Sequence, residues 1–372
     1  MAPTPDANAG MSPSSTSRSA ISRRLLLTGG AAALGLAGAE TLTACTRYHP
    51  VAASSRSAAS AGGGGSPSSG SSASHEALPP VPAHYAIAPS RPQPVPGKTE
   101  IGAFLQLKNM SVTQALALRR RQLGRSYAVQ QWFYQFNDTF AQEYSTSQGA
   151  ATLAYSWFGT TYNDILAGKW DQHFITNAER LAGYGKPIFM RFAWEMNGHW
   201  YKHSGARNGN NPAKFIQTWR YVYEIFQKHG ATNVGWVWSP YYRSDPAASW
   251  NAIENYYPGD AYVDWVGVSG YFTVPQQTPE SIFDPVYMMY AGKKPIMIAE
   301  IGIVKMDPRV MAGRLESFAD YVERRPGIAS VVWFDTNVHV NYLGQHVDLR
   351  VDINPNLLAA YRTMGLSPHF TT

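Results

Sequence analysis

The sequence predicts a single (β/α)8 (TIM) barrel, an α/β fold in which eight parallel strands alternate with helices. After about Lys98, short runs rich in β-branched and aromatic residues alternate with helical patterns, which is typical of βα units. Eight such runs occur within about 270 residues, close to the length of about 250 that is usual for this barrel. A doubly wound open sheet is the alternative, but "IGAFLQLKNMS" lacks the Gly-rich phosphate loop expected after its first strand.

Composition supports one large globular domain and excludes some partners. The chain has 372 residues, of which 44% are hydrophobic and 13% aromatic, enough for a sizeable core. Its formal charge is +6. Six basic and three acidic residues precede position 98, so the first 97 residues carry +3 and the rest of the chain carries the other +3. The remaining +3 forms no basic stripe, so we expect no nucleic-acid partner. No motif indicates a cofactor, and we expect a monomer.

Residues 1–45 resemble an export signal. "SRRLLL" (Ser22 to Leu27) is similar to the twin-arginine motif, and a Gly/Ala-rich apolar stretch follows it. "LTAC" ends in Cys45, the only cysteine, and resembles a lipobox, in which the cysteine is lipidated. The alternative is an ordinary cleaved signal. The apolar stretch is too short to span a bilayer, so we expect an extracytoplasmic protein attached to the cell envelope only through a lipid at Cys45.

Residues 46–97 are expected to form a disordered linker. Between positions 51 and 74, all residues except Val51 and Arg56 are Ala, Ser, Gly or Pro, which cannot bury enough surface to fold. The prolines from Pro79 to Pro96 predict a stiffer, extended approach. The folded domain is therefore expected to occupy residues 98–372.

The eight predicted strands follow in order. They are 101–107, 127–136, 151–158, 187–195, 233–240, 263–272, 295–302 and 328–337. Helix signals lie between them. One predicted helix has Ser111 as its N-cap and closes at Gly124, and another has Asn211 as its cap, Pro212 in its first turn and Gly230 as its stop.

Two glutamates end predicted strands on opposite sides of the barrel. In this fold the active site lies at the carboxyl-terminal ends of the strands, so Glu195 and Glu300 are candidate catalytic residues, whereas Asp264 starts its strand and is expected to be structural. Strand alternation places residues 191, 193 and 195 on one face and residues 296, 298 and 300 on one face, which we interpret as pointing inward. Such a carboxylate pair is what glycoside cleavage requires.

Aromatic residues gather near the same strand ends. One ring alone is more often part of a core, but a group of rings at one end of a barrel suits the apolar faces of sugars. The aromatic residues at predicted strand ends, or directly after them, are Trp132, Tyr134, Trp157, Phe158, Trp200, Tyr201, Trp238, Tyr241, Tyr271 and Trp333.

The stretch "RFAWEMNGHW" resembles the Arg-x-x-His-Glu-Met-Asn-Gly-x-Trp motif of glycoside hydrolase family 26. With "IMIAEIG", "VSGYF" and "VVWFD", residues from about 98 to 368 are similar to that family's barrel, within the clan of retaining (β/α)8 glycosidases. The resemblance implies an endo-β-1,4-mannanase-like enzyme with Glu195 as acid/base and Glu300 as nucleophile. It also implies Tyr271 as a hydrogen-bond donor to the nucleophile, Arg191 as a charge beside it, and Trp333 as the floor under the cleaved sugar.

One position departs from the family motif. Trp194 stands where the family has His, which removes a polar contact near the cleaved sugar and leaves a β-glucan, a xylan or an exopolysaccharide as alternative substrates. Asn197 is a candidate to bind sugar hydroxyls instead. The full set of expected substrate-binding residues is Arg191, Trp194, Asn197, Trp200, Trp157, Trp238, Tyr271 and Trp333.

Two other classes of barrel compete with this interpretation. A metal-dependent hydrolase requires ligands that converge at strand ends, but His199, His203, His339 and His346 lie in loops, so no metal site is expected. A non-catalytic carbohydrate-binding barrel would keep the aromatic residues and lose one carboxylate, whereas both are present. Asp335, next to Trp333, is a further carboxylate that we expect to make a structural hydrogen bond.

Overall fold

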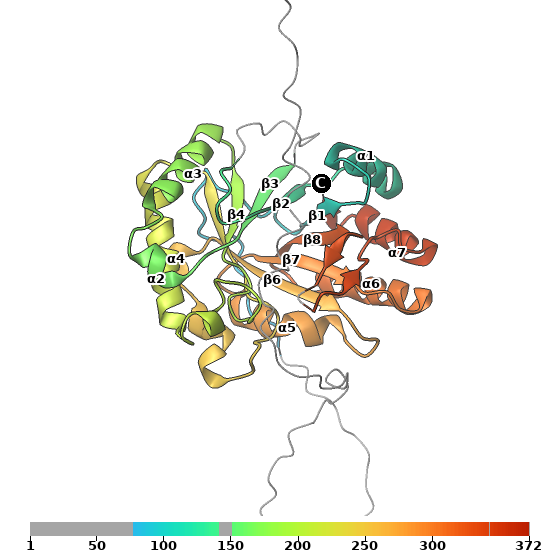
Figure 1. Ribbon diagram of the computed structural model, residues 1–372. Helices are drawn as coiled ribbons and strands as arrows, with labels where there is room; N and C mark the ends of the chain where they lie inside the picture. The colour runs from blue at the N-terminus through green and yellow to red at the C-terminus, as the bar shows by residue number, and fades with distance from the viewer. Residues whose placement is uncertain (1–76, 141–150, 342, 372) are drawn as a thin grey trace, which may run out of the picture.

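Eight parallel strands close into a barrel in the computed structural model, which describes residues 77–140, 151–341 and 343–371 (Figure 1). Each strand pairs with the next, and β8 pairs in parallel with β1, with Ala103 opposite Trp333. The strands are β1 (Thr99–Gln106), β2 (Val129–Tyr134), β3 (Thr152–Trp157), β4 (Ile188–Phe192), β5 (Val234–Trp238), β6 (Trp265–Phe272), β7 (Ile296–Ile303) and β8 (Ile328–Thr336). The predicted (β/α)8 barrel is confirmed, and the open sheet is excluded because its edge strands would not pair.

Helices surround the strands, and the predicted caps are present. The helices are α1 (Val112–Leu123), α2 (Tyr162–Leu166), α3 (Asp171–Tyr184), α4 (Pro212–Lys228), α5 (Pro279–Tyr290), α6 (Pro308–Glu323) and α7 (Pro355–Leu366). Ser111 caps α1 in a reciprocal box with Gln114, and Asn211 accepts a hydrogen bond from the Lys214 N–H at the start of α4. Of the helices in these described ranges, none is long and apolar enough to cross a membrane.

Shorter elements fill the remaining connections. Between β5 and β6 the chain forms the 3-10 turns η3 (Ser249–Asn251), η4 (Ile253–Tyr256) and η5 (Asp260–Tyr262), and η2 (Gly205–Arg207) follows β4. After β8, the strands β9 (His339–Val340) and β10 (His346–Val347) pair in an antiparallel hairpin, and β11 (Phe370–Thr371) pairs with the start of β1.

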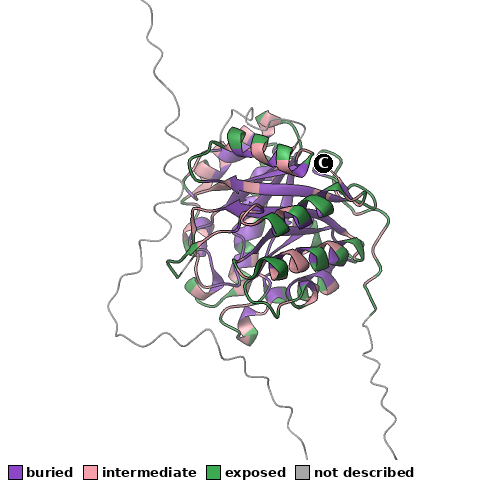
Figure 2. Ribbon diagram, turned by 90° about the vertical axis from the view of Figure 1, so that its right-hand side faces the viewer, coloured by how far each residue is buried: buried purple, intermediate pink, exposed green. Residues whose placement is uncertain are grey.

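Two apolar layers hold the barrel together. The larger lies between strands and helices, so the strands are buried on both faces while the outer faces of the helices are exposed (Figure 2). The smaller fills the barrel interior and consists of Ala128, Val129, Ala154, Phe189, Val237, Trp265, Met297, Ala299, Ala329 and Val332. Membership of these two layers shows which way each strand residue points.

An extra residue in β7 reverses the predicted alternation of that strand. Ile298 lies opposite Val268 but Glu300 lies opposite Ser269, so Ala299 forms a bulge. Before the bulge, Ile296 and Ile298 pack in the outer layer, whereas Met297 and Ala299 lie in the inner layer. The prediction that residues 296, 298 and 300 share one face is wrong, and Glu300 points inward because the bulge shifts the register.

The segment 77–97 lies against the amino-terminal ends of the strands. Arg91 donates to both carboxylate oxygens of Asp264, which directly precedes β6, at 2.8 and 3.0 Å. The Trp265 indole N–H, inside the barrel, donates to the Pro92 carbonyl at 3.0 Å, and the Tyr85 hydroxyl donates to the Ala291 carbonyl. The described part of the predicted linker thus packs on the barrel, and the structural role expected of Asp264 is confirmed.

Candidate active site

Glu195 reaches the interior through an unusual backbone turn after β4. Ala193 and Glu195 have φ angles of 46° and 54°, in the left-handed region, which costs about 1 kcal/mol for each residue. The Ala193 N–H donates to the Trp157 carbonyl and the Glu195 N–H to the Ser239 carbonyl, at 2.9 and 2.8 Å. These bonds to the neighbouring strands hold the turn. Gly159 is required beside it, because a Cβ there would lie 2.9 Å from that of Ala193.

Arg191 occupies the centre of the barrel below the two glutamates. Its guanidinium is buried and donates to hydroxyl groups from three other strands or their ends: Ser156, Ser239 and Ser269. It also donates to Oε1 of Glu300. Since all three nitrogens of the guanidinium donate hydrogen bonds, its position is tightly determined.

Glu300 accepts hydrogen bonds on both carboxylate oxygens. Arg191 donates to Oε1, and the Tyr271 hydroxyl donates to Oε2. The two contacts that the family resemblance implies are therefore present. Both donors fix the position of the Glu300 side chain, as the side chain of a nucleophile must be fixed.

Glu195 has a different environment. Its side chain is buried, and burial together with the nearby Glu300 raises its pKa to about 7, while Arg191, Ser269 and Trp200 oppose the rise. The Trp200 indole N–H donates to Oε2 at 2.9 Å. A carboxyl group with this pKa is substantially protonated at neutral pH, so it can donate a proton and later accept one.

Trp194 forms a wall of the site and is 1% exposed. Its ring packs against Phe158, Tyr201 and Phe133, with centroid distances of 4.5, 5.3 and 5.3 Å. The Arg191 guanidinium lies 5.2 Å from the same ring, in cation–π range. Where the family motif has a histidine, this chain therefore has an aromatic surface in contact with the central arginine.

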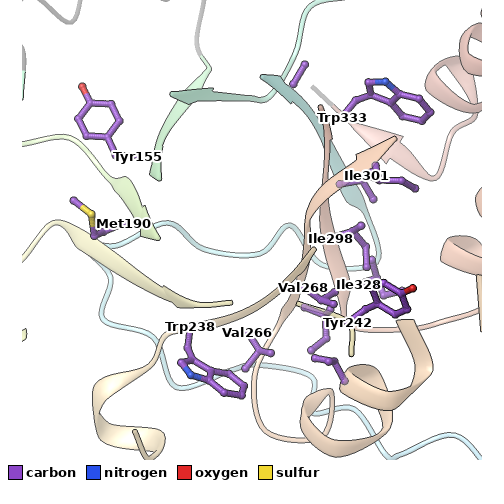
Figure 3. Packing of buried hydrophobic residues seen from close by; sticks show 14 of the residues in the cluster. Tyr155, Met190, Trp238, Tyr242, Val266, Val268, Ile298, Ile301, Ile328 and Trp333 are labelled. Atoms are coloured by element: carbon purple, nitrogen blue, oxygen red, sulfur yellow. The ribbon is translucent and has the colours of Figure 1, made fainter. Parts of the chain in front are cut away.

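Three of the predicted substrate-binding tryptophans point away from the site. Trp157, Trp238 and Trp333 are fully buried in the outer layer, where Figure 3 shows Trp238 and Trp333. Their rings pack respectively on Phe174 of α3, on Tyr290 of α5 and on Tyr361 of α7. The predicted contacts of these three residues with substrate are wrong, because alternation directs their side chains toward the helices.

Other rings line the interior: Phe104 of β1, Phe133 of β2 and Phe334 of β8. Phe334, one residue beyond Trp333, stacks on Phe104 at 5.0 Å and meets Phe133 edge-on at 5.7 Å. The signal that could have identified them is the alternation of side chains along a strand. Val129 lies in the inner layer, and Phe133, four residues further along β2, is expected on the same face. Phe334 replaces Trp333 as the aromatic residue that β8 presents to the site.

Asn197 has a structural role instead of the predicted contact with sugar. Its carboxamide donates to the Tyr241 carbonyl at 2.9 Å and accepts from the Tyr241 N–H at 2.8 Å. The side chain is fully buried. Because both ends of the amide are used by the loop after β5, neither is available to a ligand.

Asp335 is confirmed as structural. It forms a buried ion pair with Arg119 of α1 at 2.5 Å, and Arg119 also binds Asp352 before α7. Within residues 77–140, 151–341 and 343–371, no group of three His, Asp or Glu side chains could hold a metal ion. Cys45 lies outside the described residues.

Comparison with known proteins agrees with this geometry. The model of glycosyl hydrolase family 26 matches residues 128–328. Endoglucanase H of Acetivibrio thermocellus is 27% identical over 71% of this chain and 30% of that protein. Mannan endo-1,4-beta-mannosidase A and B of Caldalkalibacillus mannanilyticus is 32% identical over 39% of this chain and 26% of that protein. The chain thus spans less than a third of either relative.

One solved structure adds a comparison of folds. The family 26 β-mannanase of Bacteroides ovatus has a TM-score of 0.55 at 16% identity, over 74% of this chain and 90% of that one. At this identity the likeness shows a shared fold.

Proposed function

This chain belongs to glycosyl hydrolase family 26, and from that premise we propose that it hydrolyses a β-linked polysaccharide by a retaining double displacement. The observation that carries the proposal is the contrast between two inward-pointing carboxyl groups. Glu195 has a pKa raised to about 7 by burial and by Glu300, whereas Glu300 accepts hydrogen bonds from Arg191 and Tyr271. One group is suited to donate a proton and the other to attack as an anion.

The proposed reaction has two steps. In the first, a carboxylate oxygen of Glu300 attacks the anomeric carbon while Glu195 protonates the departing glycosidic oxygen, so that the glycosidic bond breaks and a glycosyl ester forms. In the second, Glu195 accepts a proton from water, which attacks the same carbon and releases Glu300. Arg191 and Tyr271 stabilise the Glu300 carboxylate when it departs, and Trp200 stabilises the Glu195 anion between the steps.

We propose a β-1,4-mannan as the substrate, with endo action. The support is the family itself and the relative named as a mannan endo-1,4-beta-mannosidase. A β-glucan is the second candidate, because Trp194 presents an aromatic surface in place of the family's histidine and because the relative matched over 71% of this chain is named an endoglucanase.

We also propose that the enzyme is a monomer, exported by its twin-arginine-type signal and held at the cell envelope by a lipid on Cys45. The export and the lipid anchor rest on "SRRLLL" and "LTAC" in the sequence. Mass spectrometry of the mature protein tests it, because an N-terminal residue other than a lipid-modified Cys45 would exclude the anchor.

The function is tested with a panel of β-mannan, β-glucan and β-xylan, using the wild type, Glu300→Ala and Glu195→Gln. We expect kcat to fall about 10⁴-fold or more in Glu300→Ala and about 10²- to 10⁴-fold in Glu195→Gln. Glu100→Gln is the matched control, because burial also raises the pKa of Glu100 to about 7 although it lies near the amino end of β1. Activity that survives in Glu300→Ala would exclude the mechanism, and a wild type inactive on every glycan would favour a binding protein.

A further inference from the structure

His339 stands in the hairpin that follows β8, at the end of the barrel where Glu195 and Glu300 lie. It begins β9, and its backbone pairs with Val347 of β10. Its imidazole meets the ring of Phe334 edge-on, with centroids 5.1 Å apart and planes at 86°. The hairpin therefore directs this side chain back toward the inner aromatic residues.

Phe334 connects the imidazole to the centre of the site. The centroid of its ring lies 6.1 Å from that of Tyr271, whose hydroxyl donates to Glu300. One aromatic ring thus separates His339 from the residue that holds the proposed nucleophile. Glu300 also acts electrostatically on His339. Burial lowers the pKa of His339, and Glu300 opposes that lowering.

The nitrogens of His339 have no hydrogen-bond partner in the part of the chain that the structure describes, although the residue is half-buried. The buried His203 differs, because one of its nitrogens accepts from the Gly159 N–H at 3.1 Å and the other contacts the Trp194 carbonyl at 2.8 Å. Because the side chain is only half-buried and its nitrogens remain accessible to solvent, a ligand can reach them.

We propose that His339 binds a hydroxyl group of the sugar residue held beside Glu300. The inference rests on the proposed function and adds a specificity-determining residue to it. A neutral imidazole offers one N–H donor and one acceptor, which suits a hydroxyl group that can both donate and accept. Trp194, after β4, is buried, whereas His339 supplies a polar contact from the β8 side.

The test compares His339→Phe, His339→Gln and, as the control, Val340→Ala at the exposed neighbouring position. Phe retains ring packing on Phe334 without the nitrogens, whereas Gln retains a donor and an acceptor. The probes are β-1,4-linked hexasaccharides of mannose, glucose and xylose. On the one that the wild type cleaves best, we expect kcat/KM to fall about tenfold in His339→Phe, the effect of one hydrogen bond. His339→Gln should recover most of that loss, and Val340→Ala should match the wild type.

Two further measurements separate binding from a structural role. Unfolding temperatures of the Phe and Gln variants should equal that of the wild type, and a monodeoxy hexasaccharide lacking the contacted hydroxyl should be cleaved equally by wild type and His339→Phe. An active wild type with undiminished His339→Phe overturns the proposal, as does equal loss in the Phe and Gln variants with a lower unfolding temperature. If calorimetry and turnover show that the wild type neither binds nor cleaves any probe, the glycosidase function itself fails, and the role of His339 fails with it.

Discussion

Glu195 illustrates how one side chain couples function to stability. Burial raises its pKa from 4.5 to about 7, so the folded protein retains a proton that the unfolded chain releases above about pH 4.5. The free energy of unfolding therefore falls as pH rises from 4.5 to 7, by about 3 kcal/mol for this shift. The same desolvation that makes the group an acid near neutral pH destabilises the fold once the group ionises.

Trp200 should set the alkaline limit of activity. Its indole N–H donates to Glu195 and favours the ionised carboxylate, so Trp200→Phe should raise the pKa of Glu195. We expect the alkaline limb of kcat/KM, near pH 7 in the wild type, to move upward by about one pH unit. The measurement is the pH dependence of kcat/KM, with Trp170→Phe, in the outer layer against α3, as the control. A limb that stays in place or moves to lower pH would show that this hydrogen bond does not govern the acid.

At the scale of secondary structure, the sequence predicts strand ends better than strand faces. Glu195 and Glu300 are identifiable because each is a single carboxylate in the carboxyl-terminal part of an otherwise apolar run, whatever the rotation of its strand. The sequence does not show which face of the strand Trp157, Trp238 and Trp333 occupy. The strands are apolar on both sides, and a tryptophan packs equally well against a helix. Single extra residues, such as Ala299 in β7, also reverse alternation without any local signal in the sequence.

Asn197 joins the turn after β4 to the loop after β5, and its loss should weaken that junction. In Asn197→Ala, two hydrogen bonds between the buried Asn197 side chain and the Tyr241 backbone are lost, so we expect the free energy of unfolding to fall by about 2 to 4 kcal/mol. Urea unfolding measures this, and Asn163→Ala on α2 is the control, with an expected change below about 0.5 kcal/mol. A stable Asn197→Ala variant with a raised KM would instead support the predicted contact between Asn197 and the sugar.

At the scale of the whole molecule, the two ends of the barrel carry separate ion pairs with separate roles. Arg191 and Glu300 lie toward the carboxyl-terminal ends of the strands, where the proposed chemistry occurs. Arg91 and Asp264 lie at the amino-terminal ends, where the segment 77–97 meets the barrel. The apolar inner layer lies between them. Changes at the amino-terminal end should therefore alter stability without altering catalysis.

Arg91→Met tests that separation. It leaves the Asp264 side chain, 6% exposed, with an uncompensated charge, so we expect the free energy of unfolding to fall by about 3 to 5 kcal/mol. The control is Arg350→Met, which breaks a pair with Asp348 whose side chains are 33% and 31% exposed and should cost below about 1 kcal/mol. Below the unfolding transition, both variants should keep the kcat/KM of the wild type. Equal stability of the two variants would mean that the segment 77–97 contributes little to the barrel, whereas a loss of kcat/KM in folded Arg91→Met would mean that the two ends are coupled.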